Sequence, residues 1–169
     1  MKTKSIRKLA SVTFLVGIAA AVLPPGLHAQ RGPQDSWYLN KEVPLPVMPG
    51  LNMPHDFDIA PNGDVYVPSW GNDRVSVWGA DGAFKTAWSS YGAADGQLWD
   101  PHGLAIGPSE VYVTDMGNDR VQVFDLQGNF LRKWGSGGSA DGRFNNPWGI
   151  ALDVNGSSVS EIYVADKDN

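Results

Sequence analysis

Two histidines are the first candidates for binding chemistry in this sequence. His55 and His102 each follow a proline, in the contexts Met-Pro-His-Asp-Phe and Asp-Pro-His-Gly-Leu. Neutral imidazole is a common metal ligand, and imidazoles at matching places in a repeated fold can converge on one ion. Two interpretations stay open: the pair belongs to a zinc site, or both rings line the mouth of a channel without metal.

Three tryptophans beside predicted loops are further candidate ligand contacts. They are Trp70, Trp99 and Trp148. Tryptophan is enriched at binding hot spots, because a large ring buries much apolar surface at one position. Trp148 stands where the other units have His55 and His102, so the sequence shows no third histidine ligand. The alternative is that these rings pack between neighbouring units of the fold.

Asp115 and Arg120 form a candidate ion pair across a predicted tight turn, with Asn118 between them. A carboxylate and a guanidinium this close can form a charge-assisted hydrogen bond that holds two strands together. We expect this pair to be structural. The first unit has Ser69 in place of the aspartate, so its turn should be less firmly held.

No motif for a nucleophile, a phosphate-binding glycine loop, a cysteine-based metal site or a HExxH helix is present. The acidic residues Asp56, Asp58 and Asp64 do not have the spacing of a calcium-binding loop. We expect them to be solvated surface residues. The residue types therefore favour a binding role over chemistry of the chain's own.

The candidate residues recur because the chain repeats itself every 46 residues. Val-Tyr-Val at 65–67 returns at 111–113, Gly-Asn-Asp-Arg-Val at 71–75 returns at 117–121, and Ala-Asp-Gly at 94–96 returns at 140–142. A third copy opens at Pro147 and reaches Asp166, with extra residues that indicate a longer turn at 155–158. A fixed period of this size is typical of repeat folds.

Each unit holds four short strand candidates. In the second unit they are Gly103–Ile106, Glu110–Thr114, Arg120–Phe124 and Phe130–Trp134. Apolar and polar residues alternate within them, and glycine, proline and asparagine separate them. Four strands in about 46 residues is the size of a propeller blade. The sequence therefore predicts an all-β fold built from four-stranded blades.

The unit closely resembles the NHL repeat. The matching residues lie at 101–106, 111–115 and 117–124, and the resemblance extends over residues 53–169. It implies a β-propeller, usually six-bladed, with blades at 53–100, 101–146 and 147–169. The third unit stops at Asn169, before its third strand, so we expect about two and a half blades of a longer, incomplete propeller.

The Pro-His contexts also resemble, more distantly, those of peptidyl-hydroxyglycine α-amidating lyase, whose propeller holds zinc through histidines. This resemblance implies a metal role for His55 and His102. It is incomplete, because the lyase uses three histidines on alternate blades and these two lie on adjacent ones. Trp70 and Met116 stand in the region of the lyase's catalytic tyrosine.

The N-terminus has the layout of a secretory signal peptide. Four basic residues precede an apolar run from Leu9 to Leu23, and a Pro-Pro-Gly break leads to Ala29. We expect cleavage after about Ala29, a Pro-rich segment at 30–52, and a secreted or periplasmic protein without a stable membrane anchor. Loss of the four basic residues takes the net charge from −5 to −9, which argues against nucleic acid as a partner.

These patterns favour an exported NHL-repeat propeller that acts as a binding scaffold, without a cofactor. The expected partner is a protein, a peptide or a small molecule at the propeller face. A zinc-dependent lyase of the amidating type is the alternative. RNA recognition, known for some NHL domains with basic faces, is less compatible with the acidic chain. Exposed blade edges also predict self-association.

Overall fold

The computed structural model describes residues 3–5, 29–31, 37–39 and 51–169 of the chain. The predicted signal peptide and Pro-rich segment therefore lie largely outside the described residues. The first sheet has the order β4-β5-β6-β7 and is antiparallel throughout. Its strands are β4 (Asp58–Ile59), β5 (Val65–Ser69), β6 (Arg74–Trp78) and β7 (Phe84–Trp88).

The second sheet repeats this arrangement, again with four antiparallel strands in chain order. Its strands are β8 (Pro101–Ile106), β9 (Glu110–Asp115), β10 (Arg120–Asp125) and β11 (Phe130–Trp134). Three-residue 3-10 turns, η1 (Trp70–Asn72) and η2 (Met116–Asn118), join the second strand to the third in the two sheets. An aspartate with φ 51° follows each turn, Asp73 after η1 and Asp119 after η2.

The third sheet is a long antiparallel hairpin of β12 (Pro147–Asn155) and β13 (Ser158–Asp166). The short strand β1 (Thr3–Ser5) pairs in parallel with β13, at its free edge. A separate two-stranded ribbon consists of β2 (Ala29–Arg31) and β3 (Trp37–Leu39). The extra residues of the third unit lengthen β12 and β13, and a turn of only two residues, 156–157, joins them, so the predicted longer turn at 155–158 is wrong.

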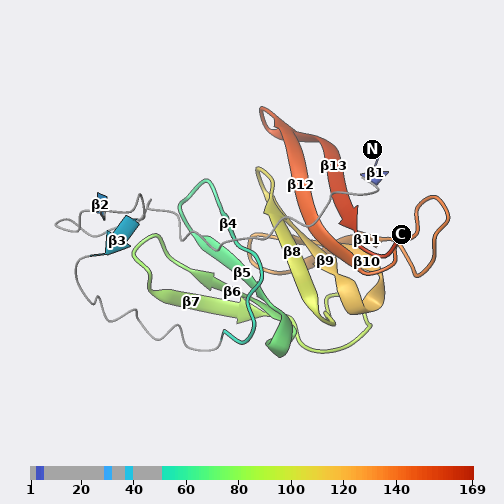
Figure 1. The fold of residues 1–169 in the computed structure, drawn as a ribbon, viewed down its shortest axis with the longest axis horizontal. Helices are drawn as coiled ribbons and strands as arrows, with labels where there is room; N and C mark the ends of the chain where they lie inside the picture. Colours follow the sequence, from blue (N-terminus) through green and yellow to red (C-terminus); the bar gives the residue numbers. More distant parts are fainter. Residues whose placement is uncertain (1–2, 6–28, 32–36, 40–50) are drawn as a thin grey trace.

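The three sheets follow one another in chain order, and each packs against the next (Figure 1). One hydrophobic cluster joins the first sheet to the second, with Tyr66 and Val75 against Leu104 and Val111. A second cluster joins Tyr112 and Val121 to residues of the third sheet. The described residues are thus nearly all β, and consecutive four-stranded sheets that bury their faces on each other are the arrangement of propeller blades.

The first strands of neighbouring sheets approach closely. A Cβ atom on Gly103 would lie 2.4 Å from the backbone oxygen of Trp148 and 3.0 Å from the Cα atom of Gly149. Thr114 stabilises the approach, since its hydroxyl donates to the Trp148 oxygen at 2.8 Å. This contact draws the start of β12 against β8.

The acidic residues near β4 are not solvated surface residues, so that prediction is wrong. Asp56 accepts the backbone N–H of Leu104 at 2.9 Å, and Asp58 accepts that of Ile106 at 2.8 Å. Asp64 is 7% exposed and pairs with Lys85 at 2.6 Å. The prediction failed because the edge of β8 offers unpaired N–H groups that attract carboxylates from the preceding sheet.

The helical part of the described chain consists of the two 3-10 turns, and no described helix is long and apolar enough to cross a membrane. The observed strands match the predicted ones closely. Phe130–Trp134 has the predicted bounds, whereas β8 begins two residues earlier than predicted, at Pro101. Its first residue pairs with Asp115, so the proline starts the strand where no N–H is needed.

Candidate ligand-binding site at the ring cluster

Four aromatic rings from three consecutive sheets meet at one end of the sheets. His55 precedes β4, His102 and Trp148 are the second residues of β8 and β12, and Trp70 opens η1 after β5. The start of a first strand and the end of its antiparallel partner lie at the same end of a sheet. We name these four residues the ring cluster.

His102 lies at the centre of the ring cluster. Its ring centroid is 3.8 Å from that of Trp148, 4.3 Å from that of His55 and 6.0 Å from that of Trp70. The planes of Trp70 and His102 are inclined by only 26°. The structure thus brings together both predicted histidines and two of the three predicted tryptophans.

Exposure within the ring cluster is uneven. His102 is 2% exposed and Trp148 is 37% exposed, while His55 is exposed and Trp70 half-buried. A buried imidazole beneath exposed rings forms the floor of a surface that a flat or apolar group can contact.

Burial, together with the neighbouring His55 and Lys167, lowers the pKa of His102 to about 4. The imidazole is therefore neutral at pH 7. Its buried Nδ1 atom has no hydrogen-bond partner among the described residues. A buried polar atom without a partner is costly, and such atoms are often found where a ligand supplies the missing bond.

Lys167 is a site residue that the sequence did not reveal. Its Nζ atom lies 4.5 Å from the ring centroid of Trp148, in a cation–π contact. The indole N–H of Trp70 donates to the Asp100 carboxylate, whose pKa is raised chiefly by burial. The rim of the ring cluster therefore carries both an ammonium group and a carboxylate.

Trp99 does not join the ring cluster. Its ring packs against Tyr91, at 6.0 Å between centroids, and covers Gly117, where an added Cβ atom would lie 2.6 Å from the indole. Trp99 is 43% exposed. It precedes β8 by two residues, but the left-handed backbone of Asp100, with φ 51°, separates it from the strand.

The Asp115–Arg120 pair is buried between the second sheet and the linker that enters it. Asp115 Oδ2 accepts from Arg120 Nε at 2.6 Å, and the arginine side chain is 7% exposed. Arg120 also donates to three backbone carbonyls of the linker, those of Ala93, Ala94 and Gln97. Its contacts hold the β7–β8 linker in place and do not reach the ring cluster.

The zinc interpretation can be compared with the donor atoms near the two histidines. No three His, Cys, Asp or Glu side chains among the described residues are grouped so that they could hold a metal ion. Protein zinc sites use at least three protein ligands. Within the described part of the chain, His55 and His102 therefore lack the third ligand that a zinc site needs.

No family model and no curated protein matches the sequence. Among solved structures, the chain is similar to Kuenenia stuttgartiensis hydrazine synthase, with 18% identity, a TM-score of 0.48, and coverage of 61% of this chain and 27% of that one. It is also similar to virginiamycin B lyase from Staphylococcus aureus, with 18% identity, a TM-score of 0.48, and coverage of 67% and 34%. A streptogramin B lyase has 16% identity, the same TM-score and the same coverage.

These structures are β-propeller proteins. This chain spans 27% to 34% of their length.

Proposed function

We propose that this chain is part of an exported propeller of the NHL-repeat type that acts as a binding scaffold, and that the ring cluster contacts its ligand. The observation that carries the proposal is the meeting of His55, His102 and Trp148 from three consecutive sheets. Rings that come from separate sheets at one end form a composite surface. Propellers host many functions on such faces, so the ligand must be argued from the site.

The chemistry of the ring cluster favours a ligand with a flat or apolar group, such as an aromatic side chain of a peptide or a small planar molecule. Trp148 and His55 present exposed rings, and His102 offers an unpaired buried nitrogen beneath them. A ligand group that stacks on Trp148 displaces the ammonium group of Lys167. Neutral His102 adds no charge repulsion at pH 7.

A ligand screen of the purified chain tests this proposal. The probes are short peptides with a single Phe, Tyr or Trp and planar heterocycles, detected by ligand-observed NMR and thermal shift. We expect Trp148→Ala to weaken any bound probe at least tenfold, because truncation of a hot-spot aromatic side chain costs on the order of 2 kcal/mol or more. Trp99→Ala is the matched control, since Trp99 is equally large and similarly exposed. Equal losses in both variants would reject the ring cluster as the site.

The zinc-dependent lyase is a second candidate, and the proximity of the two imidazoles at 4.3 Å is the observation in its favour. Titration with Zn²⁺ by calorimetry separates the two functions. With two imidazoles alone, we expect weak binding or none. Tight stoichiometric binding that disappears in His55→Ala and in His102→Ala would favour the lyase over the binding scaffold.

Export is part of the same proposal and has its own test. The N-terminal charge and hydropathy pattern supports cleavage after about Ala29. Mass spectrometry of the protein recovered from outside the cytoplasm should give an N-terminus near Gln30. Recovery of the mature protein with an intact Met1 would contradict it.

A further inference from the structure

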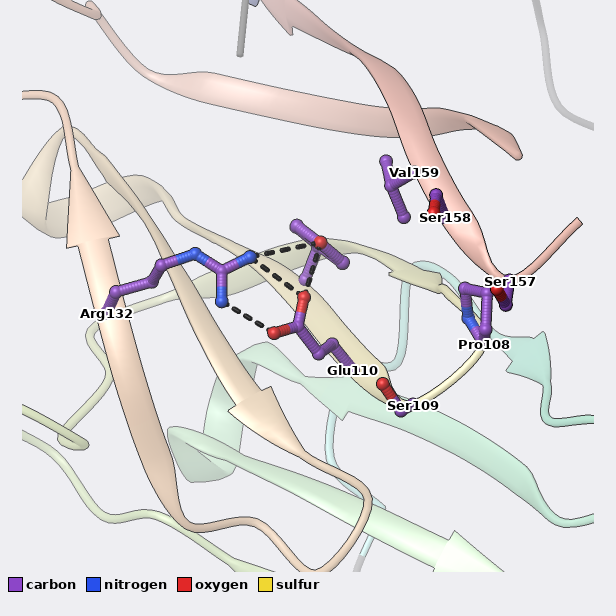
Figure 2. A pocket seen from close by; sticks show the side chains of 8 residues that line it. Pro108, Ser109, Glu110, Arg132, Ser157, Ser158 and Val159 are labelled. Carbon is purple, nitrogen blue, oxygen red and sulfur yellow. Dashed lines mark hydrogen bonds and ion pairs between the residues drawn. The ribbon is translucent and has the colours of Figure 1, made fainter. Parts of the chain in front are cut away.

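A pocket of about 320 Å³ lies between the second and third sheets, at the end of β8 opposite the ring cluster. Figure 2 shows its walls. The β8–β9 turn supplies Ser109, the β12–β13 hairpin supplies Ser157 and Ser158, and strands β9 and β11 of the second sheet supply Glu110 and Arg132. Pockets that hold small ligands begin at about 300 Å³, so this one has room for a single small molecule.

A hydrogen-bonded triad forms one wall of the pocket. The Arg132 guanidinium donates to both carboxylate oxygens of Glu110, at 2.6 Å and 2.8 Å. The Tyr112 hydroxyl donates to Glu110 at 2.6 Å and accepts from Arg132 at 3.2 Å. The dashed lines in Figure 2 mark these bonds. The triad holds the carboxylate and the guanidinium in one fixed plane, as bidentate pairs do.

The triad leaves hydrogen-bonding capacity on residues that line the pocket. A guanidinium has five N–H donors, and the triad uses three of those of Arg132. Glu110 Oε1 accepts one bond where it can accept more. The hydroxyls of Ser109, Ser157 and Ser158 are exposed and make no hydrogen bond within the described part of the chain. The pocket thus offers donors and acceptors side by side.

The charges of this wall cancel. Hydrogen bonding to Arg132 lowers the pKa of Glu110, and burial with the Glu110 bond raises the pKa of Tyr112 to about 12. The wall therefore holds one anion, one cation and a neutral phenol at pH 7. An anionic ligand meets repulsion from Glu110 and a cationic ligand meets it from Arg132. Neighbouring hydroxyl groups of a neutral ligand can donate to Glu110 and accept from Arg132 at the same time.

Two departures from the repeat meet at this pocket. At the position of Arg132 the first unit has Thr86, 46 residues earlier. In the third unit, 51 residues separate Ile162 from the matching Val111, so its hairpin is five residues longer than the period requires. The added hairpin tip carries the serines that close the pocket. Features that break a repeat without improving its packing are expected at functional sites.

We propose that this pocket binds a neutral polyhydroxylated molecule of monosaccharide size, with Glu110 and Arg132 holding two adjacent hydroxyl groups. The serines of the two turns contact the remaining hydroxyls. The site is separate from the ring cluster, because it lies at the opposite end of β8. It does not depend on the function proposed for that cluster.

Saturation-transfer NMR on the full purified chain tests the proposal. The probes are the methyl α-glycosides of glucose, galactose and mannose, each titrated to obtain Kd. We expect saturation transfer to at least one of them. Arg132→Thr, which copies the first unit, and Glu110→Gln should each weaken binding at least tenfold. Arg143→Thr is the matched control, because Arg143 is exposed and bonds only the Gly137 carbonyl in the described structure.

Trp148→Ala should leave glycoside binding unchanged, which keeps this test distinct from that of the ring cluster. If Arg132→Thr fails to fold, Ser158→Val on the hairpin carries the test, with an expected loss of at least fivefold. Absence of saturation transfer from all three glycosides would overturn the proposal. So would equal binding by Arg132→Thr and the native chain, or tighter binding of acetate or tetramethylammonium than of every glycoside.

Discussion

Replacement of Asp115 by alanine is expected to lower the free energy of unfolding by about 3–5 kcal/mol, the cost of breaking a buried ion pair on one side. Asp115 is fully buried and accepts from Arg120, Asn118, Gln122 and the backbone N–H of Trp99. Its removal leaves a buried guanidinium without a counter-charge and several donors without acceptors.

Urea unfolding followed by fluorescence measures this loss. Asp166→Ala is the matched control, because Asp166 is the equivalent residue of the third unit and accepts from Asn145 N–H and Asn169. No arginine pairs with Asp166 in the described structure. The difference in unfolding free energy between the two variants therefore measures what the Arg120 guanidinium contributes through its pair with Asp115. Equal destabilisation by both substitutions would show that the Asp115–Arg120 ion pair adds nothing to the stability of the fold.

Acidification is expected to destabilise the native chain through His102. The folded pKa is about 4 because the ring is buried between His55 and Trp148, whereas the unfolded value is 6.5. The unfolded state therefore binds the proton first. Stability at pH 7 contains a contribution that is lost as pH falls from 6.5 to about 4, amounting to about 3 kcal/mol.

Comparison with His102→Phe isolates this effect. Unfolding free energies at pH 7, 5.5 and 4 should fall more steeply for the native chain than for the variant. The raised pKa values of Asp56 and Asp100 act in both proteins, so their contributions cancel to first order in the difference. Parallel pH profiles would show that the imidazole protonates as easily in the folded chain as in the unfolded one.

The strands of the second sheet could be predicted from the sequence because local chemistry decides them. Alternating valines around Tyr112 and Gln122 mark the two central strands, and glycine with asparagine marks the turns between them. Because the chain repeats every 46 residues, the same strands are predicted for the first sheet. The convergence of His55 and His102 also followed from the period, because matching positions in successive repeats lie at the same end of their sheets.

Contacts between sheets could not be predicted in the same way. In the sequence, Asp56 and Asp58 resemble ordinary surface residues. Only the fold places the edge of β8 beside them, where they accept its backbone N–H groups. Lys167, directly after β13, lies over the ring of Trp148 on the paired strand β12, and no local sequence pattern indicates that contact. The pocket at Arg132 depends on how far the β12–β13 hairpin projects over the neighbouring turn. The carboxylate bonds and the pocket are set by the packing of two units, and the Lys167 contact is set by the pairing of two strands. The period of the strands encodes neither.

The hydrogen bonds between sheets give the chain a direction in which to fold. Asp56 and Asp58 satisfy the edge of the sheet that follows them, and Asp73 and Asp119 accept the N–H groups of Asp100 and Asn146, at the entrance of the next sheet. Each sheet thus finds its partners already formed on its N-terminal side. A chain that leaves a ribosome or a secretion channel N-terminus first can therefore complete one sheet at a time and use each as a template for the next.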